Sequence, residues 1–281
     1  MTTTVAEPRT IDAGGIATSY LEAGSGEPVL MLHGSGPGVS ATANWQYTIG
    51  PLSQRFHVLA PDIVGFGATE RSEDVVYSLR TWTDHVWAFL DAHNITRTAI
   101  VGNSLGGRIA LQMATDAPDR ISRTVLMGSP GVGMTPTAGL AALRAYEPSH
   151  EAMRHMLRTY FAVDPALITD ELVTIRYEAS IADGAYEAYR AMFFDPRHKG
   201  SELGITAEEV RAIATPTLLV HGREDKVVPL AVSVTMLDLL PNADLHVFSR
   251  CGHWTQIEHA DEFADLVIRF LRSGPSADAH E

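Results

Sequence analysis

The segment Gly102-Asn-Ser-Leu-Gly106 contains the residue best suited to act as a nucleophile. It has the pattern G-x-S-x-G, follows the apolar run 98–101 and precedes the helical pattern 105–117. A serine at such a strand-to-helix turn adopts strained backbone dihedrals, and its hydroxyl then points out above the sheet. The simpler alternative is that Ser104 only caps the helix. The strand, turn and helix around it favour the nucleophile.

A neutral serine needs a base, and His253 is suitably placed to serve as one. It follows the last apolar run and precedes the final helical pattern. Two acids, Glu224 and Asp225, follow the apolar run 217–220, and either could orient the imidazole. The order serine, acid, histidine is that of the α/β-hydrolase fold. The alternative for the acids is a surface turn in which they pair with neighbouring basic side chains.

Several other histidines lie in regular patterns and are expected to have no chemical role. His57 and His246 fall within strand runs, where a structural role is expected. His85, His93 and His155 fall on helical patterns, where a surface position is the default expectation. His253 therefore remains the candidate base.

The glycine-rich segment 33–38 is predicted to supply a backbone donor for a developing oxyanion. It follows the apolar run 28–32, and its three glycines allow an amide to face the serine. We assign this donor to Ser35, with Gly36 as the close alternative, and a second donor to the amide of Leu105. One such donor contributes roughly 3–4 kcal/mol of transition-state stabilisation.

Signatures of other chemistries are missing from the sequence. No Gly-Lys-Ser/Thr follows the glycine-rich segment, and the spacing G-x-G-x-x-G is not met, which argues against a P-loop or a dinucleotide site. No H-E-x-x-H or paired cysteines occur, so no metal is expected. Cys251 is a weak candidate nucleophile, because a lone cysteine beside a glycine is more often a small packed side chain.

Short apolar runs alternate with longer helical patterns along most of the chain. This alternation predicts the class α/β, with a mostly parallel central sheet covered by helices on both faces. The clearest helix is the last, over residues 263–271, with apolar residues at helical spacing. The expected strands lie at 16–21, 28–32, 56–60, 98–101, 123–127, 217–220 and 244–248.

Residues 130–215 interrupt this alternation, because no strand pattern occurs there. We therefore predict a core of residues 1–129 and 216–281 with a helical lid, 130–215, inserted in it. Insertions of that length are usually functional, and the alternative is a helical addition that only contributes stability. The amphipathic pieces within it lie near 138–146, 151–161, 169–181 and 185–194.

Composition limits the class of protein. The 281 residues carry a net charge of -13, which disfavours binding to nucleic acid or to an anionic membrane surface. No apolar stretch is long enough to span a membrane, and the first residues do not resemble a secretory signal. The single cysteine excludes an intrachain disulfide, which suits a reducing cytoplasm.

Taken together, several motifs resemble those of the meta-cleavage product hydrolases, α/β-hydrolases of aromatic degradation. They are His33-Gly-Ser-Gly-Pro-Gly, Gly102-Asn-Ser-Leu-Gly-Gly, Arg176-Tyr-Glu-Ala-Ser, His221-Gly-Arg-Glu-Asp and Cys251-Gly-His-Trp-Thr-Gln. The resemblance covers nearly the whole chain and is greatest to the branch that acts on 2-hydroxymuconic semialdehyde and 2-hydroxy-6-oxohepta-2,4-dienoate. It implies Asp225 as the acid, no cofactor and a homodimer.

The resemblance also implies residues that contact an anionic 2-hydroxydienoate substrate. Asn44, Asn103, Arg176 and Trp254 would hold its carboxylate and enol, which suit a bidentate guanidinium and amide donors. Val227 would line the pocket for the distal substituent. Each has a structural alternative: a helix cap for Asn44, a surface arginine paired with a nearby glutamate for Arg176, and core packing for Trp254 and Val227.

The implied reaction has two stages. The dienol first becomes its keto tautomer, and the distal ketone is then attacked, so that the carbon–carbon bond breaks and 2-hydroxypenta-2,4-dienoate and a carboxylic acid are released. Direct attack by Ser104 and attack by an activated water both remain open, and His253 moves protons in either case. An ester or lactone hydrolase of the same fold is the main rival, and a non-catalytic binding protein is the other.

Overall fold

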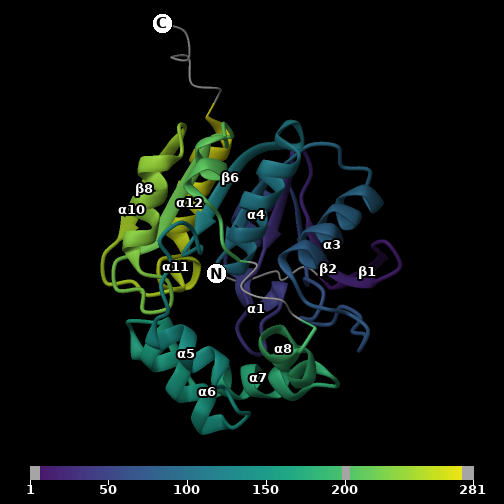
Figure 1. Cartoon of the computed structure of the whole chain (residues 1–281), viewed down its shortest axis with the longest axis vertical. Helices are drawn as coiled ribbons and strands as arrows, with labels where there is room; N and C mark the ends of the chain where they lie inside the picture. Colours follow the sequence, from purple (N-terminus) through teal and green to yellow (C-terminus); the bar gives the residue numbers. More distant parts are fainter. Residues whose placement is uncertain (1–6, 198–202, 274–281) are drawn as a thin grey trace, which may run out of the picture.

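The computed structural model describes residues 7–197 and 203–273, which form an eight-stranded sheet with helices on both faces (Figure 1). The strand order is β1-β2-β4-β3-β5-β6-β7-β8. β1 and β2 pair antiparallel, β2 and β4 also pair antiparallel, and the other neighbours run parallel. The predicted α/β class is confirmed, and only β1 had no counterpart in the sequence prediction. The strands are β1 Arg9–Asp12, β2 Ala17–Ala23, β3 Pro28–Leu32, β4 His57–Pro61, β5 Thr98–Asn103, β6 Ile121–Met127, β7 Thr217–Gly222 and β8 Ala243–Phe248.

The central strands are apolar along their whole length because both of their faces are covered. In β3, Leu30 and Leu32 belong to one buried cluster, whereas Val29 and Met31 belong to another on the opposite face. The first cluster includes side chains of α3 (Leu79–Ala92), α4 (Leu105–Asp116) and α10 (Leu230–Leu239). The second includes side chains of α1 (Ala41–Trp45), α2 (Ile49–Ser53) and α12 (Ala260–Arg272).

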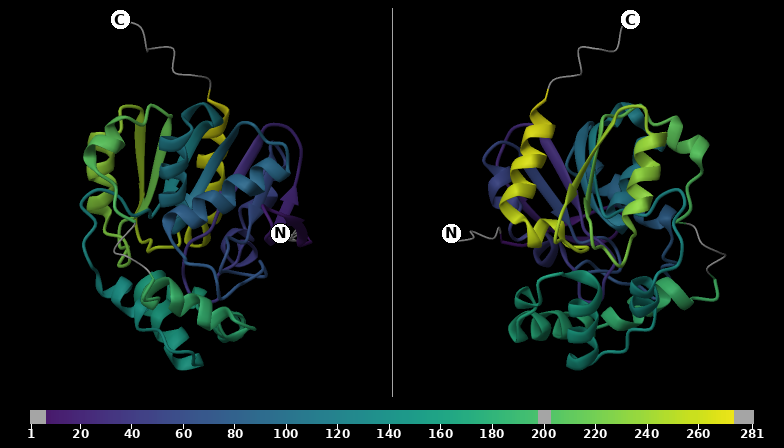
Figure 2. Two further views of the ribbon diagram at one scale, coloured as in Figure 1. Left: turned by 45° about the vertical axis from the view of Figure 1, so that its right-hand side comes forward. Right: turned by 90° about the vertical axis from the view of Figure 1, so that its left-hand side faces the viewer.

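The segment between β6 and β7 contains helices and no described strand. The helices of residues 138–194 lie together beyond one end of the sheet, as the two views of Figure 2 show, whereas the short helix of residues 207–211 packs against α10 beside the sheet. N-cap side chains of Thr137, Ser149 and Thr169 begin three of these helices, each accepting a hydrogen bond from a backbone N–H. The elements are α5 Ala138–Arg144, α6 His150–Met156, a π-helical turn Leu157–Phe161, a 3₁₀ turn Pro165–Leu167, α7 Asp170–Ile181, α8 Ala185–Phe194 and α9 Ala207–Arg211.

Of the histidines predicted to lie on helix surfaces, His85 is buried, so that expectation is wrong. It lies on the face of α3 that packs against the sheet. Val64 N–H donates to its Nδ1, and its Nε2–H therefore donates to Thr18 Oγ1 at 2.8 Å. The spacing of α3 marks this face as the apolar one, and a neutral imidazole with both nitrogens bonded fits there.

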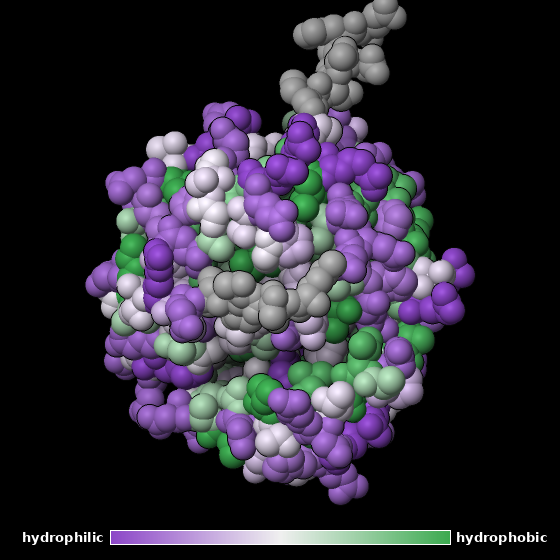
Figure 3. Space-filling model, turned by 180° about the vertical axis from the view of Figure 1, so that it is seen from behind, coloured by the Kyte–Doolittle hydropathy of each residue, from purple (hydrophilic) through white to green (hydrophobic). Residues whose placement is uncertain are grey.

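One face of the outer surface is shown in space-filling form in Figure 3. The face in Figure 3 has hydrophobic side chains scattered among hydrophilic ones. Among the described residues, no helix is long and apolar enough to cross a membrane.

Candidate active site

Ser104 lies at the turn between β5 and α4 in a strained backbone conformation, with φ 51° and ψ -113°. Positive φ is uncommon for a residue with a side chain, and strained backbone conformations cluster at functional sites. The turn is so tight that a methyl group on Gly106 would lie 2.2 Å from the carbonyl oxygen of Leu32, and only glycine fits there. Ser104 makes no capping hydrogen bond to α4, so the helix-cap alternative does not explain it.

His253 and Asp225 form a buried pair at the ends of two neighbouring strands. Asp225 follows β7, and its Oδ2 lies 2.7 Å from His253 Nδ1. Because a carboxylate only accepts, Nδ1 carries a proton, and in the neutral tautomer of the ring Nε2 is then the acceptor that can take a proton from Ser104. The other carboxylate oxygen accepts from the backbone N–H groups of Val227 and Val228, at 2.8 and 2.9 Å. These bonds hold the carboxylate in one orientation.

The second acid considered for this role lies elsewhere. Glu224 Oε2 accepts from the backbone N–H of Cys251 at 3.0 Å, and so ties the β7 loop to the β8 loop. The structure therefore brings Asp225, and not Glu224, to the imidazole.

Ser104 and His253 line one cavity of about 20 Å³, together with residues of the lid segment. This volume holds about one water molecule, so a substrate can bind only when the surrounding groups move. The one side-chain hydrogen bond of His253 among the described residues is to Asp225. Bonds between nucleophile and base are often long without ligand and tighten in the complex. The lining residues are Gly34, Ser35, Gly36, Val39, Asn44, Asn103, Ser104, Leu143, Phe161, Arg176, His253 and Trp254.

The loop after β3 lies directly against the serine. A methyl group on Gly34 would be 3.3 Å from Ser104 Cβ, and both Ser35 and Gly36 line the cavity. His33 supports this loop: its Nδ1–H donates to the Gly34 carbonyl, and its Nε2 accepts from Ile63 N–H. Burial lowers the pKa of His33, which favours this neutral form. Sequence reasoning had not assigned His33 a role.

Leu105 follows Ser104 as the first residue of α4, and its side chain is buried in the core. First-turn N–H groups of a helix have no carbonyl partner within the helix, so its amide is available to an oxyanion at Ser104. The side chain does not line the cavity.

Arg176 comes from α7 and is 4% exposed. Its Nη2 donates to the carbonyl of Pro37 at 3.0 Å, and its guanidinium carbon lies 5.6 Å from the ring centroid of Trp254. Its Nε has no partner among the described residues. Burial lowers the pKa of Arg176 to about 10, so the group still carries its charge at neutral pH. A surface arginine paired along the helix, the alternative reading, is excluded by this burial.

The two asparagines also border the cavity. Asn44 is buried on α1, and its Nδ2 has no partner within the described residues. The cap of α1 is Ser40, so capping does not explain Asn44. Asn103 ends β5, and its Nδ2 donates to the carbonyl of Met127 at 3.3 Å. The amide of Asn44 is therefore free to bind a polar ligand.

Val227 is not among the residues that line this small cavity, and its predicted place beside the distal substituent stays a prediction. Its side chain is buried, and its backbone N–H binds Asp225. Leu143 and Phe161, from the lid segment, line the cavity instead and had not been predicted.

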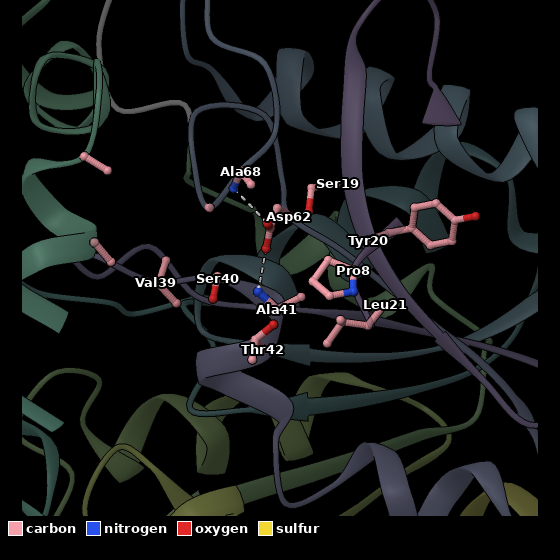
Figure 4. Close-up of a pocket in the computed structure, with 13 residues that line it drawn as sticks. Pro8, Ser19, Tyr20, Leu21, Val39, Ser40, Ala41, Thr42, Asp62 and Ala68 are labelled. Atoms are coloured by element: carbon pink, nitrogen blue, oxygen red, sulfur yellow. Dashed lines mark hydrogen bonds between the residues drawn. The ribbon is translucent and has the colours of Figure 1, made fainter. Parts of the chain in front are cut away.

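A second, larger cavity of about 260 Å³, drawn in Figure 4, is lined by neither Ser104 nor His253. The carboxylate of Asp62 borders it, but its two oxygens accept from the N–H groups of Ala41 and Ala68. Asp62 therefore anchors the start of α1, which carries Asn44. Val39 borders both cavities. Among the described residues, no group of three or more His, Cys, Asp or Glu side chains could hold a metal ion.

Comparison with known proteins gives the fold family of the chain and then its relatives. A model of the alpha/beta hydrolase fold matches residues 27–260, which is most of the chain. A 2-hydroxymuconate semialdehyde hydrolase of Pseudomonas sp. (strain CF600) is 47% identical over 270 residues, or 96% of this chain and 95% of the relative. A 2-hydroxy-6-oxo-2,4-heptadienoate hydrolase of Pseudomonas putida is 44% identical over 264 residues, or 94% of this chain and 95% of the relative.

A solved structure agrees with these relatives. The meta-cleavage product hydrolase of Pseudomonas fluorescens IP01 is 47% identical, with a TM-score of 0.90 over 94% of this chain and 97% of that one. The chain belongs to the meta-cleavage product hydrolases of the alpha/beta hydrolase fold family. The expected family and fold are confirmed.

Proposed function

We propose that this protein hydrolyses a carbon–carbon bond in ring-fission products of the 2-hydroxy-6-oxohexa-2,4-dienoate type. The observation that carries the proposal is Arg176, a buried guanidinium with no ion-pair partner among the described residues. It borders the same cavity as Ser104 and His253. A buried charge is costly unless it is paired, and a carboxylate substrate would supply the partner. Hydrolysis of a neutral ester gives no reason for such a charge.

In this proposal the dienoate end of the substrate lies between the core and the lid. Arg176 binds the carboxylate, and the amides of Asn44 and Asn103 bind the 2-oxygen, which carries growing negative charge as the bond breaks. Trp254, beside the guanidinium, contacts the planar diene. Helices α5 to α8 act as the lid, and Arg176 on α7 links lid closure to substrate binding.

The chemistry needs only groups of the chain and of the substrate. The dienol becomes its keto tautomer, with His253 Nε2 moving the proton. Ser104 Oγ then attacks the 6-carbonyl carbon, a step favoured by the strained elbow that exposes it. The amides of Leu105 and of Ser35, or of Gly36 as its close alternative, stabilise the oxyanion. The bond between C5 and C6 breaks, and its electron pair moves into the conjugated keto acid and is protonated. Water then releases the acyl group from Ser104 as a carboxylic acid.

A small group at C6 suits the site best. The relative at 47% identity is named for 2-hydroxymuconate semialdehyde, an aldehyde, and the relative at 44% identity is named for 2-hydroxy-6-oxo-2,4-heptadienoate, a methyl ketone. A relative named for the 6-phenyl substrate is 36% identical. Leu143 and Phe161 line the cavity from the lid segment, and a ring at C6 would require them to move further than a hydrogen or methyl group would.

A spectrophotometric assay tests both parts of the proposal. We expect rapid loss of the dienoate absorbance, with kcat/KM for the hydrogen or methyl substrate at least about 10-fold above the phenyl substrate. The same enzyme should hydrolyse p-nitrophenyl acetate slowly. A clear preference for the ester would overturn the proposal in favour of a carboxylesterase or lactonase.

We also propose that the protein acts as a homodimer in the cytoplasm. The dimer is suggested by the family resemblance, and the free, buried Cys251 suits a reducing compartment. Light scattering of the purified protein at micromolar concentration would give the mass of the assembly, and a monomer mass would refute the dimer.

A further inference from the structure

Glu258, the last residue of α11 (Thr255–Glu258), joins two segments that are far apart in the sequence. Its Oε1 accepts from the backbone N–H of Gly252 at 2.6 Å, and its Oε2 accepts from the backbone N–H of Val163 at 2.7 Å. Gly252 immediately precedes His253, whereas Val163 lies in the lid segment just after the π-helical turn. One carboxylate thus holds the lid against the loop of the candidate base.

The same two segments meet at Phe161. The backbone N–H of His253 donates to the Phe161 carbonyl at 2.8 Å, and the Phe161 ring meets the His253 ring edge-on at 5.5 Å. The fit is close, because a methyl group on Gly252 would lie 2.5 Å from the Phe161 carbonyl oxygen. The position of the imidazole therefore depends on the position of this lid turn.

The π-helical turn explains how the Phe161 carbonyl becomes available. Ala162 N–H bonds back to the carbonyl of Leu157, five residues earlier, at 3.3 Å. The helix ends there, and its last carbonyls have no partner within the helix. Phe161 offers its carbonyl to His253, and Val163 turns its N–H to Glu258. π-helical turns are frequent at functional sites.

We infer that Glu258 is a positioning residue that clamps the lid turn onto the His253 loop, so that Phe161 closes over the imidazole. It does not touch the reacting atoms. The backbone N–H groups of Gly252 and Val163 hold its carboxylate in place, although burial raises the pKa of this carboxyl group. When the clamp opens, Phe161 leaves the cavity and a substrate can enter; when it closes, His253 is held in place. The catalytic part of this inference rests on the proposed function.

Cys251 provides a reporter that is independent of the reaction. It is the single cysteine of the chain, it is 0% exposed, and it lies next to Gly252. Its thiol points to Glu258 Oε1 at 3.8 Å. An aromatic disulfide reagent can reach this thiol only when the clamped loop opens, so its rate of reaction measures the opening.

Two variants break the clamp from opposite sides. Glu258→Gln removes the charge and one acceptor, and Val163→Pro removes the lid N–H while leaving the carboxylate intact. Ala162 is extended, with φ -117° and ψ 145°, and so tolerates a following proline. The matched control is Glu262→Gln on α12. It makes the same substitution at a glutamate that is bonded to His259 and not to Gly252 or Val163. Thermal unfolding verifies that each variant is folded.

We expect both clamp variants to raise the rate of Cys251 labelling about 10-fold or more, the scale of one hydrogen bond to a charged group, with the control unchanged. Removing the negative charge also lowers the pKa of the thiol, but only in Glu258→Gln, so Val163→Pro separates opening from charge. Labelling of Val163→Pro at the rate of the unmodified protein would overturn the clamp, whatever the substrate proves to be.

Turnover then tests the catalytic consequence. With a dienoate substrate, we expect kcat to fall about 10-fold in both variants while KM changes less, because His253 is misplaced after substrate binds. Faster labelling with unchanged kcat would show a purely structural clamp and would overturn the positioning role. Inactivity of the unmodified protein on every dienoate would count against the proposed function alone.

Discussion

Asp225 binds His253 through one carboxylate oxygen while its other oxygen is occupied by two backbone N–H groups. This division makes Asp225→Asn a sharp test. The asparagine must place its oxygen toward Val227 and Val228, because two N–H donors already point there. Its NH₂ group then faces His253 Nδ1, which must become an acceptor, and the imidazole proton moves to Nε2.

We therefore expect Asp225→Asn to fold normally and to lose about 10³–10⁴-fold in kcat, the scale known for the wrong tautomer in serine hydrolases. Steady-state turnover of a dienoate, with the melting temperature as the check on folding, measures this. Glu224→Gln is the matched control, since Glu224 binds the Cys251 N–H and not the imidazole. Equal losses in the two variants would argue against the assignment of the acid.

The strained backbone of Ser104 predicts that activity and stability separate at this position. Both Ser104→Ala and Ser104→Gly should lower turnover at least about 10³-fold, because neither has a hydroxyl. Only glycine relieves a φ of 51°, so Ser104→Gly should melt about 2–4 °C above Ser104→Ala. Calorimetry decides this, and equal melting temperatures would mean that the elbow stores no strain.

Local patterns predicted part of this site and could not predict the rest. The turn at Ser104 is dictated within five residues, since Gly102 and Gly106 permit the elbow, and the strand and helix on either side are strongly apolar. The loops carrying Asp225 and His253 follow from the order of parallel strands, whose carboxyl ends meet at the same edge.

The contacts from the lid have no such local cause. Phe161 reaches His253 only because a π-helical turn and Glu258 bring together segments about ninety residues apart, and no short pattern encodes that pairing. The place of Val227 stays a prediction for a related reason: adjacency in sequence does not tell which way a turn directs a side chain. Arg176 was found through family motifs, because an arginine on an amphipathic helix otherwise suggests the surface.

Arg176 is expected to increase the turnover of dienoate substrates while lowering the thermal stability of the protein. Arg176→Met keeps much of the side-chain volume and removes a buried charge that has no ion-pair partner among the described residues. We expect kcat/KM for a dienoate to fall about 10²-fold or more, while turnover of p-nitrophenyl acetate changes little. The melting temperature should rise or stay level, because replacing buried charge by an apolar group is often stabilising.

The Arg176→Lys variant is a stricter comparison. Lysine keeps the charge but lacks the planar fork that binds both a carboxylate and the carbonyl of Pro37. Restoration of dienoate turnover by lysine would show that charge alone is enough. Equal losses on the dienoate and on the ester would argue that Arg176 supports the fold and not the substrate.

Stability below neutral pH should depend on His85. Burial lowers the pKa of His85 from 6.5 to about 4, and the nearby His33 ring adds to this shift. The neutral ring is bonded to Thr18 and to the Val64 N–H. Between those values the unfolded chain binds a proton that the folded chain does not, so stability is complete above pH 6.5 and declines as the pH falls toward 4. The loss is on the order of 3 kcal/mol. Urea unfolding at a series of pH values measures this loss of unfolding free energy. In His85→Gln the amide can bond to the same two partners but does not titrate, so the free energy of unfolding should fall less steeply as the pH is lowered. A slope equal to that of the unmodified protein would place the acid sensitivity in other groups, with the buried His33 next to be tested.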